Sequence, residues 1–516
     1  MRLDVHRDER LPKLAWFARI DVEQQVTTVE VGPFVEVDSA EAPKWVVAGM
    51  WTGSFSSGDF HRAEAIFGSG LRLDDDGVHV VPASTTVDRC VYARDGATWY
   101  ASNSLVVLLG RLGARIDLRF DHRDWGESMA LGVFNYVRQF HVLHPRIPTM
   151  NQLIFESLRI GPGGVPSFHF RDVPRSFKDF ADYVTQFEGV LKTLHTNARD
   201  PARRRPMHSV TSASRGYDSA AVTSFVARLI PGIESWTAKR SNTRIPRLLQ
   251  GVMNADVADD DGSEIARTLG ATPRYLDLDL SKLPLEMEQW CWATAQISPE
   301  LVFHSMLTDA ESRDVPTIFW AGHVGDGAWE RQLGEMGLSG QICRGAQSGY
   351  ALIEARVRYG VVEASVPYLF MRSVANINKV SRSDEMKPWQ LMSDYDRPIP
   401  RRLVEERGVP REAFGFGKKA VAQDYESPQG EALRAVFFDQ TQWSAITEQL
   451  YRGVNLGIYF AQRATDFVVT RGDRGKLVAK ARRFGKRALS SVADLQRQTF
   501  FLATHQLAEK YAKRSG

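Results

Sequence analysis

The pattern that most constrains this chain begins at Met207, where short apolar strand candidates alternate with stretches of helical periodicity. The expected strands are residues 208–211, 234–237, 274–277 and 317–320, and the expected helices are 219–229, 262–269 and 301–312. Alternating elements of this kind pack as a parallel sheet with helices on both faces. We therefore expect an α/β unit whose ligand site lies at the carboxyl ends of the strands.

The region before Met207 has a different pattern. Strand candidates at residues 14–20, 25–31 and 78–81 are separated by Gly/Asp turns, and residues 88–100 have the form of a hairpin. Ser104 is placed to cap a helix over the apolar run 105–112. These signals predict a β-rich, antiparallel first domain, so the chain combines α+β and α/β architecture.

Four segments follow from these changes of pattern. Residues 1–175 form the β-rich domain, and 176–205 form a connecting helix and a basic linker. Residues 206–430 form the α/β domain, and 431–516 form a C-terminal helical region that contains a basic segment.

Composition excludes several classes of protein. The chain has 516 residues and a net charge of +3, which does not require a nucleic-acid or membrane partner. It has no apolar run long enough to span a membrane and no secretory leader, so we expect a cytoplasmic protein without a membrane span. Its three widely spaced cysteines fit neither a disulfide scaffold nor a zinc ribbon.

The segment 471–487 carries eight basic residues and one acidic residue. Its simplest interpretation is a solvated basic helix packed through Leu477, Phe484 and Leu489. The alternatives are a docking surface for an acidic partner, a carrier or tRNA, and, less favoured, a helix that lies on a membrane surface.

The first chemistry-bearing segment is the turn Ser214-Arg-Gly-Tyr-Asp-Ser219, between an expected strand and an expected helix. Such a turn directs backbone N–H groups and a helix N-terminus at one point, which favours a bound phosphate. It resembles the pyrophosphate-binding loop of the ATP-pyrophosphatase superfamily, Ser-Gly-Gly-x-Asp-Ser, with Arg215 in place of the first glycine. The resemblance implies nucleotide binding by Ser214, Arg215, Gly216, Asp218 and Ser219; the alternative is an ordinary capped βα turn.

A second turn, Ala321-Gly-His-Val-Gly-Asp-Gly327, follows the expected strand 317–320. It resembles the Ser-Gly-x-Gly-x-Asp loop of the asparagine synthetase family, with Ala321 for the serine and Val324 for the second glycine. Asp218 and Asp326, at the ends of neighbouring strands, would then hold a Mg²⁺ ion that bridges the phosphates of ATP.

Two later segments extend the resemblance. Residues 358–369 are similar to the family's Glu-x-Arg-x-Pro-Phe-Leu-Asp segment, with Glu363 at the glutamate, and residues 416–423 are similar to Lys-x-Ala-Ala-Gln, with Lys419 the better match beside Lys418. The implied role of Lys419 is to stabilise charge on the α-phosphate as pyrophosphate leaves, and the alternative is a surface lysine. Residues 256–264 resemble the family's acidic loop before a helix.

The third position of the second loop is His323. Asparagine synthetases have glutamate there, and β-lactam synthetases have a tyrosine that pairs with a downstream glutamate. An imidazole with a pKa near neutrality would accept a proton from an incoming ammonium, and we pair His323 with Glu363. The alternative is a histidine that hydrogen bonds to a backbone carbonyl.

The beginning of the chain departs from the family. Glutamine-dependent members begin Met-Cys, whereas this chain begins Met1-Arg2 and its first cysteine is Cys90. Glutamine hydrolysis is therefore not expected, because its nucleophile is missing. The first domain is expected to keep a degenerate glutaminase-like (Ntn-type) fold that serves as a scaffold or a partner surface, as in β-lactam synthetases and lasso-peptide cyclases.

The resemblance implies an AMP-forming amide ligase that uses ATP and Mg²⁺ to adenylate a carboxylate and passes the acyl group to an amine, on a small-molecule or peptide substrate. Ammonia delivered by a partner subunit is a second option for the acceptor. The competing hypothesis is a catalytically decayed relative that binds nucleotide or peptide, which Arg215, Ala321 and Val324 favour.

Overall fold

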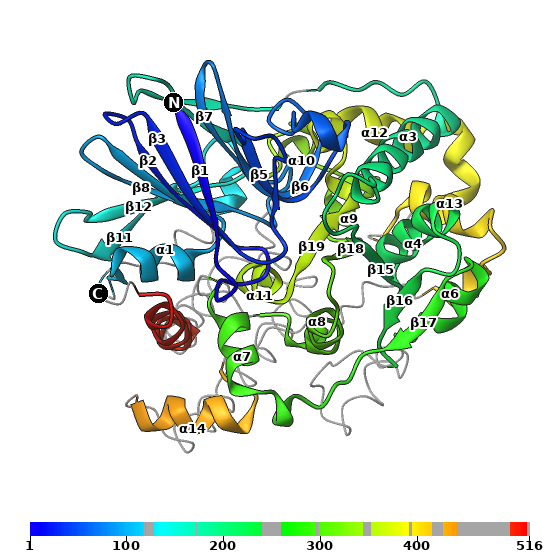
Figure 1. Cartoon of the computed structure of the whole chain (residues 1–516). Helices are drawn as coiled ribbons and strands as arrows, with labels where there is room; N and C mark the ends of the chain where they lie inside the picture. The colour runs from blue at the N-terminus through cyan, green and yellow to red at the C-terminus, as the bar shows by residue number, and fades with distance from the viewer. Residues whose placement is uncertain are drawn as a thin grey trace, which may run out of the picture.

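The computed structural model describes residues 1–117, 119, 128–171, 173–239, 260–294, 299–343, 352–391, 395–414, 427–440 and 496–512. Two largely antiparallel sheets form the N-terminal part, and a parallel sheet flanked by helices follows (Figure 1). The described chain is thus mixed α/β, with a β-rich first part and a parallel sheet in the second, as expected from the change of pattern at Met207.

The first sheet has eight strands in the order β1-β3-β2-β9-β8-β12-β11-β10. Only β1 and β3 run parallel among its neighbouring strands. Buried and half-buried residues alternate along β3, which places one face on the core. The strands are β1 Arg2–Arg7, β2 Trp16–Asp21, β3 Val26–Val31, β8 Cys90–Asp95, β9 Thr98–Ser102, β10 Arg115–Ile116, β11 Gln139–Leu143 and β12 Thr149–Leu153.

The second sheet has six antiparallel strands in the order β14-β13-β7-β6-β5-β4. It faces the first sheet, since the indole N–H of Trp16 on β2 donates to Ser69 Oγ on β6 at 3.0 Å, with both side chains buried. The strands are β4 Glu36–Val37, β5 Trp45–Trp51, β6 Ile66–Asp74, β7 Gly77–Val81, β13 Ser157–Ile160 and β14 Pro166–His169.

Local signals in this part of the sequence predict the structure well. The expected hairpin at residues 88–100 is the β8–β9 pair. The helix α1, Leu105–Leu112, begins at Ser104, whose side chain accepts from the N–H of Val107 as an N-cap.

The third sheet is parallel, with five strands in the order β17-β16-β15-β18-β19. The strands are β15 His208–Ser212, β16 Glu234–Thr237, β17 Thr272–Tyr275, β18 Thr317–Ala321 and β19 Val361–Ser365. Four of them match expected strands within two residues. The fifth, β19, was not predicted as a strand because Glu363 interrupts its apolar run, yet all five of its residues are buried.

Helices cover both faces of this sheet. Figure 1 shows α3 and α4 on one side with α13 beyond them, and α8 and α11 on the other. The helices are α3 Phe180–Ala198, α4 Tyr217–Leu229, α6 Ser263–Thr268, α7 Leu285–Trp292, α8 His304–Glu311, α9 Gly325–Trp329, α10 Glu335–Leu338, α11 Ile353–Tyr359, α12 Val374–Arg382, α13 Pro398–Glu405 and α14 Glu431–Gln440. The expected helix 301–312 is divided into a 3-10 turn, Leu301–Phe303, and α8.

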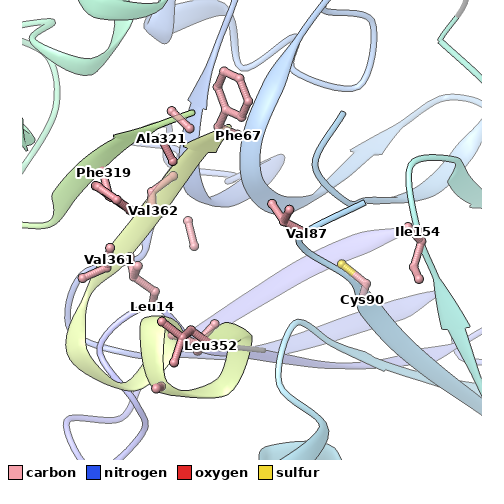
Figure 2. Packing of buried hydrophobic residues seen from close by; sticks show 14 of the residues in the cluster. Leu14, Phe67, Val87, Cys90, Ile154, Phe319, Ala321, Leu352, Val361 and Val362 are labelled. Carbon is pink, nitrogen blue, oxygen red and sulfur yellow. The ribbon is translucent and has the colours of Figure 1, made fainter. Parts of the chain in front are cut away.

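The β-rich part and the parallel sheet share a core. Figure 2 shows Leu14, Phe67 and Val87 packed beside Val361 and Val362 of β19. Buried polar contacts join the same parts: Glu354 on α11 accepts from Ser104 Oγ at 2.6 Å and from the N–H of Leu105 at 2.8 Å. The two parts are therefore tightly associated.

Residues 496–509 are helical and lie against the N-terminal part. Arg111 on α1 donates to the carbonyl of Tyr511 at 3.0 Å, and the Tyr511 ring lies 6.1 Å from that of Trp290 on α7. The basic segment 471–487 lies outside the described residues. Among the described helices, none is long and apolar enough to cross a membrane.

Candidate functional site

The candidate site lies where the strand order of the parallel sheet reverses. The chain moves from β15 to β16 and β17 on one side, and then returns to β18 and β19 on the other. Loops after β15 and β18 both leave the carboxyl edge of the sheet at this reversal, which is the usual ligand position in such sheets. The loops here are residues 213–216 and 322–324.

The first loop is held by hydroxyl groups. Ser219 Oγ accepts from the N–H of Ser214 at 3.1 Å, and Ser214 Oγ accepts from the N–H of Gly216 at 3.1 Å. The two hydroxyls are 3.0 Å apart. Gly216 is the N-cap residue of α4, and it has no capping side chain. Phosphate oxygens can replace such hydroxyl acceptors, so this turn suits an anion.

The two loops are in direct contact. A Cβ atom at Gly322 would lie 2.6 Å from the backbone nitrogen of Ser219, and one at Gly325 would overlap the carboxylate of Asp218. Any larger residue at either position would separate the loops. The arrangement therefore requires the two glycines and brings the segment of Asp326 against the segment of Asp218.

A third loop supports the first. A Cβ atom at Gly262 would lie 2.7 Å from the backbone nitrogen of Ser214, and the buried Asp260 accepts from the N–H of Arg215 at 3.2 Å. Residues 260–264, the part of the acidic segment 256–264 that the structure describes, thus pack against the backbone of the first loop. Of this segment, residues 256–259 lie outside the described residues.

The carboxylate of Asp218 forms an ion pair with Arg397, a buried side chain that precedes α13. Arg397 Nε also lies 3.5 Å from Glu330 Oε2, and its guanidinium lies 4.6 Å from the ring centre of Tyr395. Burial opposes the charge of Arg397, but Asp218, Tyr395 and Asp326 together raise its pKa. The positive charge of Arg397 therefore already interacts with both aspartates.

His323 lies between two buried glutamates. Its Nδ1 is 2.5 Å from Glu363 Oε1 and its Nε2 is 3.4 Å from Glu300 Oε2. Glu363 also accepts from Ser365 Oγ at 2.6 Å. Burial opposes a charge on the imidazole, but Glu363 and Glu300 outweigh it and raise the pKa of His323 well above its usual range. His323 is therefore an imidazolium near neutral pH, which differs from the near-neutral pKa expected from the sequence.

The network continues into the β-rich part. Burial raises the pKa of Glu363, but His323 and Arg356 lower it to about 2. Arg356 Nε lies 3.3 Å from Glu363 Oε2, and its Nη1 donates to Asp88 Oδ1 at 2.8 Å. Alternating charges thus run from Asp88 through Arg356 and Glu363 to His323.

Other expected site residues differ from the sequence-based picture. The guanidinium of Arg215 donates to the carbonyls of Ala413 at 2.9 Å and Glu412 at 3.2 Å, so it supports the backbone of residues 412–413. Lys418 and Lys419 lie outside the described residues, and their role stays a prediction. Val324 has a left-handed backbone with φ of 66°, at the position where the second loop resembles a glycine.

Arg397, Glu300 and Asp88 were missed as candidate residues. None lies in a motif, and each reaches the site through the fold. Their charge is the one property visible in the sequence. It becomes informative only when the fold shows that they are buried, because a buried charged residue normally has a partner.

No protein-family model matches this sequence, and no curated protein matches it significantly.

Proposed function

We propose that this protein is an AMP-forming amide ligase of the asparagine synthetase type, which activates a carboxylate with ATP and transfers the acyl group to an amine. The observation that carries the proposal is the contact between the loops of Asp218 and Asp326 at the reversal of the sheet. Under this proposal the β-rich part is a degenerate glutaminase-like domain without hydrolytic activity, and the reaction takes place in the cytoplasm.

The residues at the site suit an ATP–Mg²⁺ complex. Carboxylate oxygens are the ligands that Mg²⁺ prefers, and Asp218 and Asp326 would supply them. When bound, the ion would neutralise charge on the phosphates. Ser214, Gly216 and Ser219 would bind phosphate oxygens through the turn and the N-terminus of α4.

In the reaction, an oxygen of the substrate carboxylate attacks the α-phosphorus of ATP and pyrophosphate leaves with the bonding electrons. The amine nitrogen then attacks the acyl carbon, and the bond to AMP breaks. Lys419 is the proposed stabiliser of charge in the first half-reaction.

The second half-reaction releases a proton from the amine. Because His323 is already protonated, it cannot accept this proton itself. We therefore assign the proton to a carboxylate of the cluster formed by His323, Glu300 and Glu363. The oxygens of Glu300 are buried and accept no other hydrogen bond among the described residues, which makes this carboxylate the acceptor. His323 then positions Glu300 and balances its charge.

The ion pair between Arg397 and Asp218 favours a second candidate function, a relative that binds nucleotide or peptide without catalysis. In that case Arg397 would replace the metal permanently. The two functions differ in whether ATP is cleaved.

The test incubates the protein with ATP, Mg²⁺ and panels of carboxylates and amines, and measures AMP and pyrophosphate. Asp218→Asn and Asp326→Asn should each lower the rate at least about a hundredfold. Glu335→Gln, an exposed carboxylate on α10, serves as the matched control and should leave the rate unchanged. Release of ADP and phosphate would reject adenylation, and full activity of both variants would remove the aspartates from the site.

A further inference from the structure

A second cluster of ionisable side chains lies on the six-stranded sheet. His61 follows the 3-10 turn Phe55–Ser57, Asp74 ends β6, and His79 lies in the middle of β7. One ligand atom from each residue lies within 4.8 Å of the other two. The cluster belongs to the β-rich part and takes no part in the proposed ligase chemistry.

The hairpin between β6 and β7 explains how Asp74 and His79 meet. In its register Asp74 pairs with Gly77 and Arg72 pairs with His79. Residues 71, 73, 78 and 80 are buried, whereas Arg72, Asp74 and His79 are half-buried and share the opposite face. Asp74 is thus the diagonal neighbour of His79, within reach of a long side chain.

A rigid turn brings His61 to the same place. Phe60, the preceding residue, is fully buried against Trp45 and Trp51, with ring centres 6.4 Å and 5.4 Å apart. His61 is consequently fixed with its imidazole over the end of the hairpin. Its Nε2 lies 3.6 Å from Asp74 Oδ2, and its ring centre lies 4.9 Å from that of His79.

His61 has an unsatisfied side chain. The imidazole is only 5% exposed, and neither of its nitrogens has a hydrogen-bond partner in the part of the chain that the structure describes. Leaving a buried polar group unsatisfied costs about 1–3 kcal/mol. The hydrogen bond between His79 Nε2 and Asp74 Oδ1, at 3.1 Å, leaves both Asp74 Oδ2 and His61 without a hydrogen-bond partner among the described residues.

The spacing of the ligand atoms fits a metal ion. Bonds of about 2.0–2.2 Å to nitrogen and oxygen place tetrahedral ligands roughly 3.3 Å apart. The two distances to Asp74, 3.1 Å and 3.6 Å, lie on either side of this value. We propose that His61, Asp74 and His79 bind a divalent transition-metal ion of the zinc class, with solvent at the fourth position.

Two positive groups near the cluster, Arg72 and Arg159, have carboxylate partners of their own. Arg72 lies 3.0 Å from Asp59, and Arg159 lies 3.9 Å from Asp76. Both guanidinium groups are therefore engaged with carboxylates outside the cluster.

The test titrates Zn²⁺ into the full-length chain by calorimetry, after the protein has been stripped with a chelator. The proposal predicts one equivalent of bound Zn²⁺, with affinity at least about a hundredfold lower in His61→Ala and in His79→Ala. His6→Ala, an exposed histidine on β1 of the other sheet, is the matched control and should bind normally. Asp326→Asn should also bind normally, which separates this site from the proposed nucleotide site.

A second measurement guards against misfolding of the variants. Melted in chelator, His61→Ala should still unfold in one cooperative transition, which shows that the variant folds. Zn²⁺ should raise the melting temperature of the wild type and leave that of His61→Ala unchanged. Absence of a bound equivalent in the wild type, or equal Zn²⁺ affinity in His61→Ala, would overturn the proposal.

Discussion

Replacing Arg356 tests the buried charge network without knowledge of the substrate. Its side chain is 2% exposed and joins Asp88 to Glu363, and it also donates to the carbonyl of Val87 at 2.9 Å. Methionine has a similar length and no charge. Arg356→Met would therefore leave two buried carboxylates without the cation they share.

Breaking a buried ion pair by removing one partner costs about 3–5 kcal/mol. For a large domain, 1 kcal/mol corresponds to roughly 2–4 °C in melting temperature, so the expected loss is roughly 6–20 °C. The measurement is thermal unfolding of the full chain, followed by circular dichroism.

Arg358, on the same helix, provides the matched control. It is 26% exposed and lies 3.6 Å from both Glu286 and Glu311. Partly exposed pairs of this kind contribute about 0–1 kcal/mol, so Arg358→Met should melt close to the wild type. Asp88→Asn added to Arg356→Met should recover part of the loss, because one unpaired charge is removed. Equal losses for the two arginine variants, or no recovery, would refute the reasoning.

Three further predictions concern the candidate site. The pKa of His323 is raised in the folded state, so its stabilising effect is complete below the unfolded value and is lost as the pH rises. The difference in unfolding free energy between wild type and His323→Gln should therefore narrow from about pH 7 to about pH 9 in urea titrations, and widening would contradict the ion pairs. Arg397→Gln removes the cation beside Asp218, so the variant should melt lower and regain stability with Mg²⁺, whereas the wild type should respond little; an equal response would show that Arg397 does not occupy a cation position. Val324→Gly relieves a left-handed φ and should change stability by less than about 1 kcal/mol, while Val362→Gly in β19 should cost about 3 kcal/mol or more; equal losses in denaturant titrations would remove the strain argument.

Much of the secondary structure in both parts of the chain can be predicted from local patterns. The strand at 234–237 coincides with β16, and Ser104 caps α1 as its position indicates. The contact between the loops of Asp218 and Asp326 follows from two turns on adjacent parallel strands, which the β/α alternation suggests. Glycines at 322 and 325 carry that signal.

The rest depends on contacts between distant residues. Glu363 makes β19 look polar, and only its buried partners, His323 and Arg356, explain why it lies in a fully buried strand at the edge of the sheet. Arg397 contacts Asp218 because α13 packs on α4. Neither helix has a sequence pattern that predicts this packing. The raised pKa of His323 depends on Glu300 as well as on Glu363, and Glu300 is the residue just before the 3-10 turn Leu301–Phe303.

The central claim is that the loops of Asp218 and Asp326 form one site for an ATP–Mg²⁺ complex. The most direct measurement is the dissociation constant of ATP by calorimetry, with and without Mg²⁺, for the wild type, Asp326→Asn and Glu335→Gln. We expect Mg²⁺ to tighten ATP binding in the wild type and in Glu335→Gln, and to have at least about tenfold less effect in Asp326→Asn. ATP binding that does not depend on Mg²⁺, or that Asp326→Asn leaves unchanged, would contradict the claim.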